Sequence, residues 1–469
     1  MKTVLSSVCF AFVIYATAIA DQFTVTTQGT TAMGWPAGLS NQEAWNLMPP
    51  ALEGTGQQLP AWARTMVGRM PKTTAAFLQL DYAQRMEGPV DHKLRAAMRW
   101  TSAKANGSQY AMAIAAGDAI REGESPEKWA SLISGDLTGW SAKEKLALEF
   151  ARAMTVESND YTDAQFATLV ENFDARQAAS MVLHMAFANF QDRWFICLGI
   201  DADADGNSLP PVKASFDTKL LIPEAPPASP PTTTPPPAEI AKDAKTKFEN
   251  VVEGPQQTWL SYDDLQNRLD QQRKRASRLP SPDWSAIASK LPAGFMEKPS
   301  DIVWYQLSFG YAHELAVPFE IYLRTAGGEV RRNWDRLFGG SIFWMVTDAV
   351  KCPYCMGHCE MNWEVAGLSE DQIAEQSRIL AGNDWSTFTP AEQHGLAFAR
   401  KLTQSPSSIT AENIQQLRTG LGEERAFYVA LNSSRYNYMT RISNGFQLTL
   451  ESDNVFWDYY NMRRPEKKK

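Results

Sequence analysis

Two stretches of this chain share one pattern of residues: SAKEKLALEFARAMT at 141–155 and TPAEQHGLAFARKLT at 389–403. They align at a constant offset of 248 in residue number. Six identities in fifteen positions exceed the roughly one that average composition gives by chance. Each stretch opens with Ser or Thr and has Glu three residues later, which is the spacing of a helix capping box. Apolar residues then recur at helical spacing. The pattern predicts a helix at each stretch and an internal repeat.

The repeat extends in both directions along the chain. Upstream, residues 100–125 align with 344–369 at an offset of 244, and the identical pairs are Trp100/Trp344, Ala105/Ala349, Tyr110/Tyr354, Met112/Met356, Gly123/Gly367 and Ser125/Ser369. Downstream, the offset of 248 continues through the pairs Thr162/Thr410, Leu169/Leu417, Asn189/Asn437 and Arg193/Arg441. One loop insertion accounts for the change of offset. Strand patterns with hairpin turns are scarce, so we expect an all-α protein made of two tandem helical bundles.

A proline-rich segment separates the two repeats. Residues 223–237 read PEAPPASPPTTTPPP, a composition typical of a semi-rigid polyproline spacer. We predict one helical repeat at 41–221, a linker at 222–245 and a second helical repeat at 246–469. Residues 21–40 form an N-terminal extension in this division.

The N-terminus has the pattern of a secretory signal peptide at 1–20. Lys2 precedes the apolar run 5–14, and Ala18-Ile19-Ala20 is a typical cleavage site. The apolar run is too short to span a bilayer. We therefore expect a secreted or periplasmic protein with no membrane span after signal cleavage.

The composition limits the classes of function. Hydrophobic residues make up 44% of the chain and charged residues 21%, which is enough apolar surface for a packed core. The net charge is −8, and the chain has no long basic block. We expect no nucleic-acid partner.

A cluster of cysteines is the candidate reactive site of this sequence. Residues 351–360 read KCPYCMGHCE, so three of the five cysteines of the chain lie within eight residues. A helix that begins near Pro353 places Cys352, Cys355 and Cys359 on one stripe, with His358 within reach. A thiolate at a helix N-terminus is stabilised by the helix dipole, and a neighbouring thiol can resolve the product of its attack. The spacing predicts a redox-active dithiol.

With this element, the sequence resembles the alkylhydroperoxidase D / carboxymuconolactone decarboxylase family. The resemblance is carried by the C-x-Y-C-x-x-H element, the E-x-x-x-L-x-F-A-R block and the N-x-x-x-R element near the end of each half. It implies an all-α bundle that forms homo-oligomers. It also implies that Cys355 attacks and Cys352 resolves.

The resemblance implies a proton relay as well, from which this chain departs. Redox members of the family have a histidine four residues after the second cysteine, where this chain has Cys359, and His358 lies one residue earlier. They have a glutamate about twelve residues before the first cysteine, where this chain has Gly340. Asp335, about a turn further upstream, is the acidic residue expected to substitute.

The implied function is that of a thiol-dependent peroxidase. Its substrate would be a hydroperoxide or a disulfide, an unidentified thiol reductant would close the cycle, and no cofactor or metal is required. The first repeat has lost the site, since its matching positions hold Ser108, Ala111, Ile114 and Ala115.

Other interpretations of the cysteines remain open. The chain could be a non-enzymatic helical protein with a structural disulfide, or it could bind a metal through a Cys₃His set, although four ligands on one short helix surround an ion poorly. Cys-Pro-Tyr-Cys also matches the glutaredoxin tetrapeptide, which requires a βαβ fold. Separately, Asp201–Gly206 resembles the start of a calcium loop, but Val212 stands where such a loop needs Glu.

Overall fold

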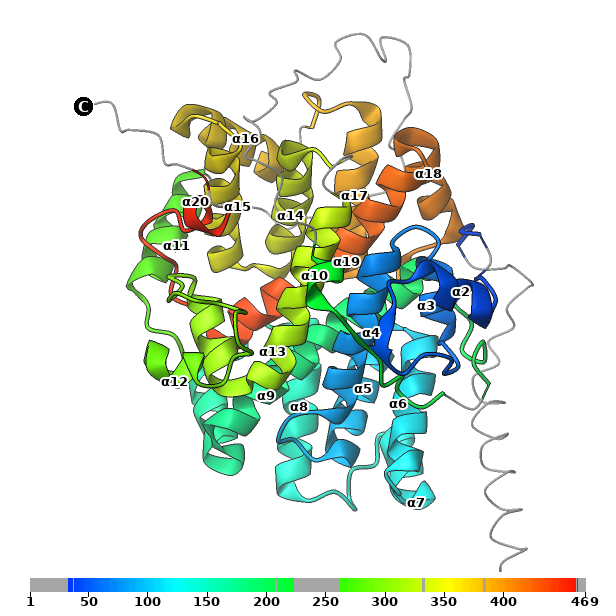
Figure 1. The fold of residues 1–469 in the computed structure, drawn as a ribbon. Coiled ribbons are helices and arrows are strands. Elements are labelled where there is room, and N and C mark those ends of the chain that lie inside the picture. The colour runs from blue at the N-terminus through cyan, green and yellow to red at the C-terminus, as the bar shows by residue number, and fades with distance from the viewer. Residues whose placement is uncertain are drawn as a thin grey trace, which may run out of the picture.

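The protein is all-α, as the sequence predicts. The computed structural model describes residues 33–36, 38–206, 209–222, 262–330, 334–382, 385–460 and 462 (Figure 1). The predicted signal peptide at 1–20 and nearly all of the predicted linker lie outside the described residues.

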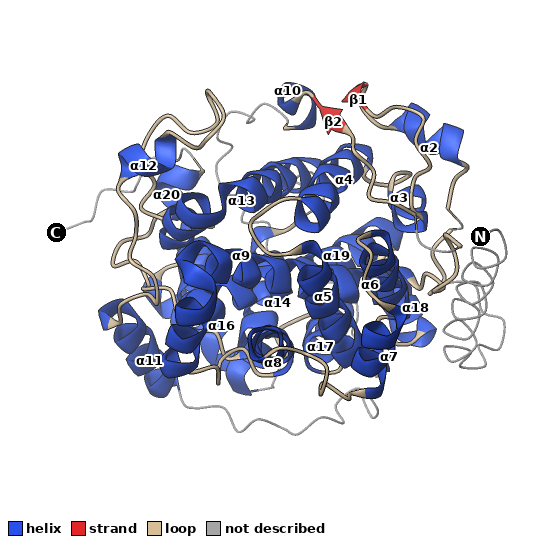
Figure 2. Ribbon diagram, turned by 90° about the horizontal axis from the view of Figure 1, so that it is seen from below, coloured by secondary structure: helices blue, strands red, loops and turns tan. Residues whose placement is uncertain are grey.

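The elements of the first half precede residue 223. In chain order they are α2 (Asn41–Leu47), β1 (Ala51–Glu53), α3 (Ala61–Met66), α4 (Pro71–Met86), α5 (His92–Asn106), α6 (Gln109–Arg121), α7 (Pro126–Ser134), α8 (Ala142–Val156), α9 (Asp163–Leu198), β2 (Ser215–Phe216) and α10 (Thr218–Leu221). The strands β1 and β2 pair antiparallel at the edge of the helical body (Figure 2).

The elements of the second half begin at residue 262. They are α11 (Tyr262–Lys274), α12 (Trp284–Ala288), α13 (Val303–Val330), α14 (Arg336–Val350), α15 (Pro353–Val365), α16 (Glu370–Gly382), α17 (Pro390–Gln404), the short 3₁₀ helix η1 (Pro406–Ser408), α18 (Ala411–Leu421), α19 (Glu423–Phe446) and α20 (Phe456–Tyr459).

The helices of the two halves recur at the offsets seen in the sequence. Both ends of α5 and α14 are related by the offset of 244, as are both ends of α6 and α15, and both ends of α8 and α17 are related by the offset of 248. The kink in α9 at Asp174 (φ 62°, ψ 168°) recurs at Gly422 (φ 79°, ψ 161°), between α18 and α19. The break between α3 and α4 at Met70 recurs as the kink of α13 at Ala312. The sequence repeat is therefore a repeat of structure.

The predicted helix starts are confirmed. Ser141 and Thr389 form capping boxes with Glu144 and Glu392 at the starts of α8 and α17. The same interaction begins the next helix of each half, at Thr162 and Thr410. These local interactions fix where the helices enter the bundle, because each satisfies backbone N–H groups that a helix leaves unpaired.

The two halves pack on each other along α9 and α19, which run through the middle of the molecule (Figure 2). Arg193 in α9 donates to the backbone oxygen of Thr403 at 3.0 Å, and Arg441 in α19 donates to the backbone oxygen of Thr155 at 3.1 Å. The two arginines are counterparts in the repeat, and so are the two threonines. The contact is therefore reciprocal, like that of a two-fold symmetric dimer. One continuous hydrophobic core joins the halves.

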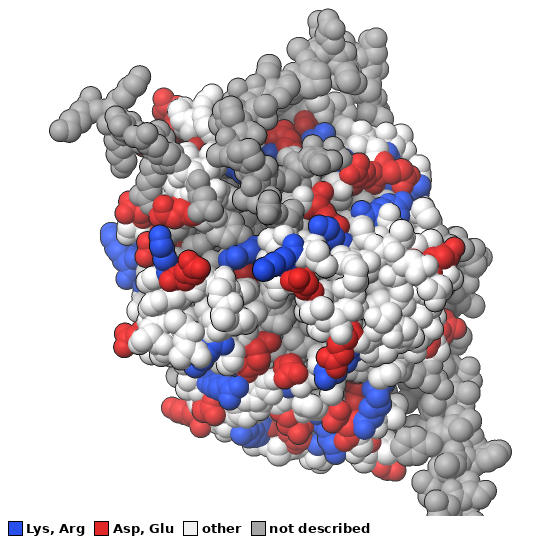
Figure 3. Space-filling model, viewed as in Figure 1, with Lys and Arg blue, Asp and Glu red and all other residues white. Residues whose placement is uncertain are grey.

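The face shown in Figure 3 has Lys and Arg side chains interspersed with Asp and Glu over the described residues. Among the described helices, none combines the length and the apolar character needed to cross a bilayer.

Candidate functional site

The two cysteines of the predicted dithiol lie at the break between α14 and α15. Lys351 ends α14 in the left-handed conformation (φ 54°, ψ 59°), and Cys352 is the N-cap of α15 with Pro353 in the first turn. The Sγ atom of Cys352 accepts a hydrogen bond from the backbone N–H of Cys355 at 3.3 Å. The two residues are joined as a disulfide, with their Cα atoms 5.4 Å apart. The pair therefore has the helix-start position that the sequence predicts.

Both cysteines are shielded from solvent. Cys352 is 0% exposed and Cys355 is 1% exposed. The Sγ atom of Cys355 lies 3.3 Å from the hydroxyl oxygen of Ser443, which itself donates to the Met439 carbonyl within α19. A reagent can reach the sulfur atoms only if part of this cover moves.

A carboxylate that the sequence analysis missed holds His358. The Nε2 atom of His358 lies 2.8 Å from Oε2 of Glu451. The other oxygen, Oε1, accepts from the Tyr354 hydroxyl at 2.7 Å and from the backbone N–H of Val303 at 2.8 Å. We call these four residues the Glu451 cluster. It ties the start of α13 to α15 and to the segment after α19.

Two aromatic rings enclose the imidazole of His358. The Tyr354 ring lies 4.2 Å away between ring centroids, and the Phe456 ring of α20 packs edge-on at 4.9 Å. Phe456 is itself half-buried. The histidine is thus oriented by Glu451 on one side and covered by α20 on another.

The electrostatics of the cluster favour a charged Glu451. Burial by itself raises the pKa of this carboxyl, but the charge and hydrogen bond of His358, together with the Val303 and Tyr354 donors, outweigh burial and lower the pKa. Burial and the adjacent carboxylate raise the pKa of Tyr354 well above its ordinary value. Tyr354 therefore stays a neutral donor while Glu451 carries the negative charge.

The first half contains the same arrangement without the histidine. Asp205 accepts hydrogen bonds from the Tyr110 hydroxyl and, at 2.9 Å, from the backbone N–H of Ala61, and it forms an ion pair with Arg64 at 3.5 Å. Tyr110 and Ala61 are the counterparts of Tyr354 and Val303, at offsets of 244 and 242. We call this set the Asp205 cluster. Because it occupies Asp205, the acidic turn at 201–206 serves as a structural tie in this structure.

A carboxylate that links neighbouring elements is thus common to both halves. The imidazole and the dithiol occur in the second half. His358 takes the place of Ile114, and Cys352 and Cys355 take the places of Ser108 and Ala111. Ser108 is the N-cap of α6, as Cys352 is of α15. The imidazole and the dithiol of the second half therefore stand on a framework that both halves have.

The structure does not bring Asp335, the expected acidic relay residue, to the cysteines. Asp335 is exposed and caps the N-terminus of α14 by accepting from the Leu337 N–H at 2.8 Å. The cysteines lie past the other end of this 15-residue helix, about 22 Å away at 1.5 Å per residue. Glu451, 93 residues beyond His358 in sequence, occupies the place expected for Asp335.

Cys359 lies one turn after Cys355 on α15 and is a free, fully buried thiol. Burial raises its pKa well above the ordinary value, which disfavours the reactive thiolate. Cys197, predicted as a buried free thiol, is confirmed as one.

The described residues give no support to the metal and βαβ interpretations. Within the described ranges, no three or more His, Cys, Asp or Glu side chains come together as a metal would require. The His358 ring faces Glu451, and Cys352 and Cys355 are bonded to each other. A helix, α14, precedes the dithiol where a glutaredoxin-like fold needs a strand.

A scan against family models finds none that matches this chain, and a search of curated proteins finds no match. The resemblance to the alkylhydroperoxidase D family therefore rests on the residues quoted above.

Proposed function

We propose that this protein is a thiol-dependent oxidoreductase of the alkylhydroperoxidase type, with Cys355 as the attacking thiol and Cys352 as the resolving thiol. The observation that carries the proposal is the Cys352–Cys355 pair at the N-terminus of α15, three residues before a histidine held by a buried carboxylate. Perturbed acid–base groups beside a dithiol are typical of redox sites. Export through the predicted signal peptide and assembly into homo-oligomers belong to the same proposal.

The reaction begins with the reduced pair. The Cys355 thiolate attacks the terminal oxygen of a hydroperoxide, the O–O bond breaks, and an alcohol leaves after taking up a proton, with a sulfenic acid on Cys355. The Cys352 thiol then displaces water and forms the disulfide. An external dithiol reduces this disulfide and is itself oxidised. Each cycle consumes one hydroperoxide and one dithiol and releases one alcohol and one water.

His358 has the role of proton carrier in this scheme. A hydrogen bond from Nε2–H to Glu451 fixes the ring and leaves Nδ1 as the basic nitrogen of the neutral imidazole. In this scheme Nδ1 accepts the thiol proton while Glu451 holds the opposite side of the ring. Ile114, its counterpart in the first half, lacks any such group.

The experiment that tests the proposal is thiol alkylation with mass spectrometry on the reduced protein, before and after one equivalent of cumene hydroperoxide. We expect Cys352 and Cys355 to pass from alkylated thiols to a mutual disulfide, and we expect Cys355→Ser to lose peroxide consumption. Cys197→Ser is the matched control, since it removes a buried free thiol from the other half. Unchanged alkylation of both cysteines after peroxide treatment would contradict the proposal.

A structural disulfide is the second candidate, and the burial of both sulfur atoms favours it. In that case reduction lowers the melting temperature, since losing a disulfide that closes a four-residue loop costs about 2 kcal/mol. Peroxide consumption would be absent in the wild type. The alkylation experiment and a melting curve with and without reductant therefore separate the two functions.

A further inference from the structure

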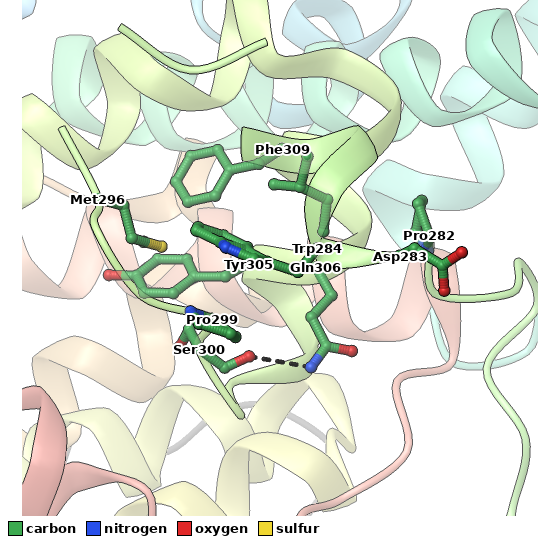
Figure 4. A pocket seen from close by; sticks show the side chains of 10 residues that line it. Pro282, Asp283, Trp284, Met296, Pro299, Ser300, Tyr305, Gln306 and Phe309 are labelled. Atoms are coloured by element: carbon green, nitrogen blue, oxygen red, sulfur yellow. Dashed lines mark hydrogen bonds between the residues drawn. The ribbon is translucent and has the colours of Figure 1, made fainter. Parts of the chain in front are cut away.

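A small cavity lies between α12, the loop at 296–300 and the first turns of α13 (Figure 4). Its volume is about 230 Å³, and its wall is mainly apolar and aromatic. Its wall includes Trp284, Ile287, Met296, Tyr305, Gln306 and Phe309. The Tyr305 and Phe309 rings are stacked, with centroids 5.0 Å apart. The Gln306 amide is held at the edge by donating to the Ser300 carbonyl at 2.9 Å.

The first half has a different side chain at the position that matches Ile287. Trp45 in α2 is the counterpart of Ile287 at the offset of 242 that relates Ala61 to Val303, and the two intervening segments have the same length. The indole N–H of Trp45 donates to the Gln57 carbonyl at 2.8 Å, and the counterpart of Gln57 is Pro299, a cavity wall residue. The first half therefore has a larger side chain, an indole, at the position where the second half has Ile287.

The open cavity belongs to the half that has the dithiol. Tyr305 and Gln306 lie on the same turn of α13 as Val303, whose N–H holds Glu451 and through it His358. The half that has Ser108 and Ala111 in place of the cysteines has Trp45 in place of Ile287. The dithiol and the cavity thus occur in the same half.

We propose that this cavity is a binding site for a small aromatic molecule, of one ring with a short polar substituent. The volume is below the range of pockets that hold drug-sized ligands, so it suits a single ring. The Trp284, Tyr305 and Phe309 rings offer faces and edges for aromatic stacking, and the Met296 thioether adapts to a ring edge. The carbonyl oxygen of the Gln306 side chain provides an acceptor for a hydroxyl on the substituent.

The test is calorimetric titration of the full chain with cumyl alcohol, an unreactive aromatic alcohol of suitable size. We expect saturable binding to the wild type and a loss of at least about tenfold in affinity for Ile287→Trp, which introduces into the cavity wall the side chain that the first half has at this position. Ser285→Trp adds the same side chain at an exposed position of α12 and is expected to bind as the wild type does. If Ile287→Trp does not fold, Ile287→Phe is the second variant that fills the cavity.

The proposal is overturned if the wild type shows no saturable binding, or if Ile287→Trp and Ser285→Trp bind with the wild-type affinity. Cys355→Ser is expected to bind cumyl alcohol normally, because the cavity contains no thiol. Binding that persists while the peroxide assay fails would reject the proposed redox function and leave the ligand site standing.

Discussion

Replacing Glu451 with Gln removes one charge from the centre of the candidate site. In the wild type this carboxylate accepts from Val303 N–H, from the Tyr354 hydroxyl and from His358, all at 2.7–2.8 Å. Hydrogen bonds to a charged group contribute about 1.5–3 kcal/mol each, against about 0.5–1.5 kcal/mol for neutral pairs. The amide oxygen can keep the first two partners, each weakened by about 1 kcal/mol, and the contact of the amide N–H₂ with His358 is weaker than that of the carboxylate by a similar amount. We expect Glu451→Gln to lower the free energy of unfolding by about 3 kcal/mol.

The loss depends on pH in a direction that the structure fixes. The pKa of Glu451 is lower in the folded protein than the ordinary value of 4.5. Its stabilising effect is therefore fully present above about pH 4.5 and is lost as the pH falls through the lower, folded pKa. Urea unfolding, followed by tryptophan fluorescence at about pH 7, 5.5 and 3.5, measures this. The wild type and the variant should differ most at the two higher values, and the difference should be smaller at the lowest.

The matched control is Asp205→Asn in the Asp205 cluster of the first half. It removes an equivalent carboxylate tie that has no histidine partner, so it should reduce stability without slowing the reaction of Cys355 with peroxide. Glu451→Gln should do both. A loss below about 1 kcal/mol for Glu451→Gln, or the same loss at pH 3.5 as at pH 7, would refute the reasoning.

Three further substitutions have defined outcomes. Burial raises the pKa of Glu360 in α15 to about 7, so its carboxyl costs stability as the pH rises from 4.5 to 7. In urea unfolding, Glu360→Gln should gain up to about 3 kcal/mol relative to the wild type at pH 8 and little at pH 4, whereas the exposed Glu375→Gln should show no such trend. Lys351→Gly should raise stability by about 1 kcal/mol, because Lys351 has a positive φ, and a lower melting temperature would contradict this. Gly357→Ala should lower the melting temperature, because its new Cβ would lie 2.5 Å from the buried Leu450 side chain; an unchanged value would show that Leu450 yields.

The sequence predicts the helical framework well, because local interactions determine it. The capping boxes at Ser141 and Thr389, and Pro353 in the first turn of α15, act over three or four residues, and all three lie where the pattern places them. The offsets of 244 and 248 also survive as matching helix ends. The contact between the halves could not be predicted. The sequence around Arg193 and Arg441 does not indicate that each arginine donates a hydrogen bond to the other half.

The acidic partner of His358 could not be predicted from the sequence, for a different reason. Counting residues upstream of Cys352 leads to Asp335, but α14 is a continuous helix and carries Asp335 to its far end. Glu451 arrives through tertiary structure, after the whole length of α19. Its counterpart Asp205 differs in residue type and lies off the main offsets, so the alignment of the two halves gave no signal for either residue.

The reciprocal contact along α9 and α19 has a consequence for which substitutions this molecule can accept. In a dimer of identical chains, each substitution appears on both sides of the two-fold axis, so a new residue must suit two environments at once. Here one polypeptide supplies both sides, and a change in one half leaves the other as it was. The first half can keep Ile114 where the second has a histidine, and Trp45 where the second has an isoleucine, without either half compromising. One half can therefore change at a position while the other keeps its residue there, and the chain has one Cys-x-x-Cys pair for its two repeats.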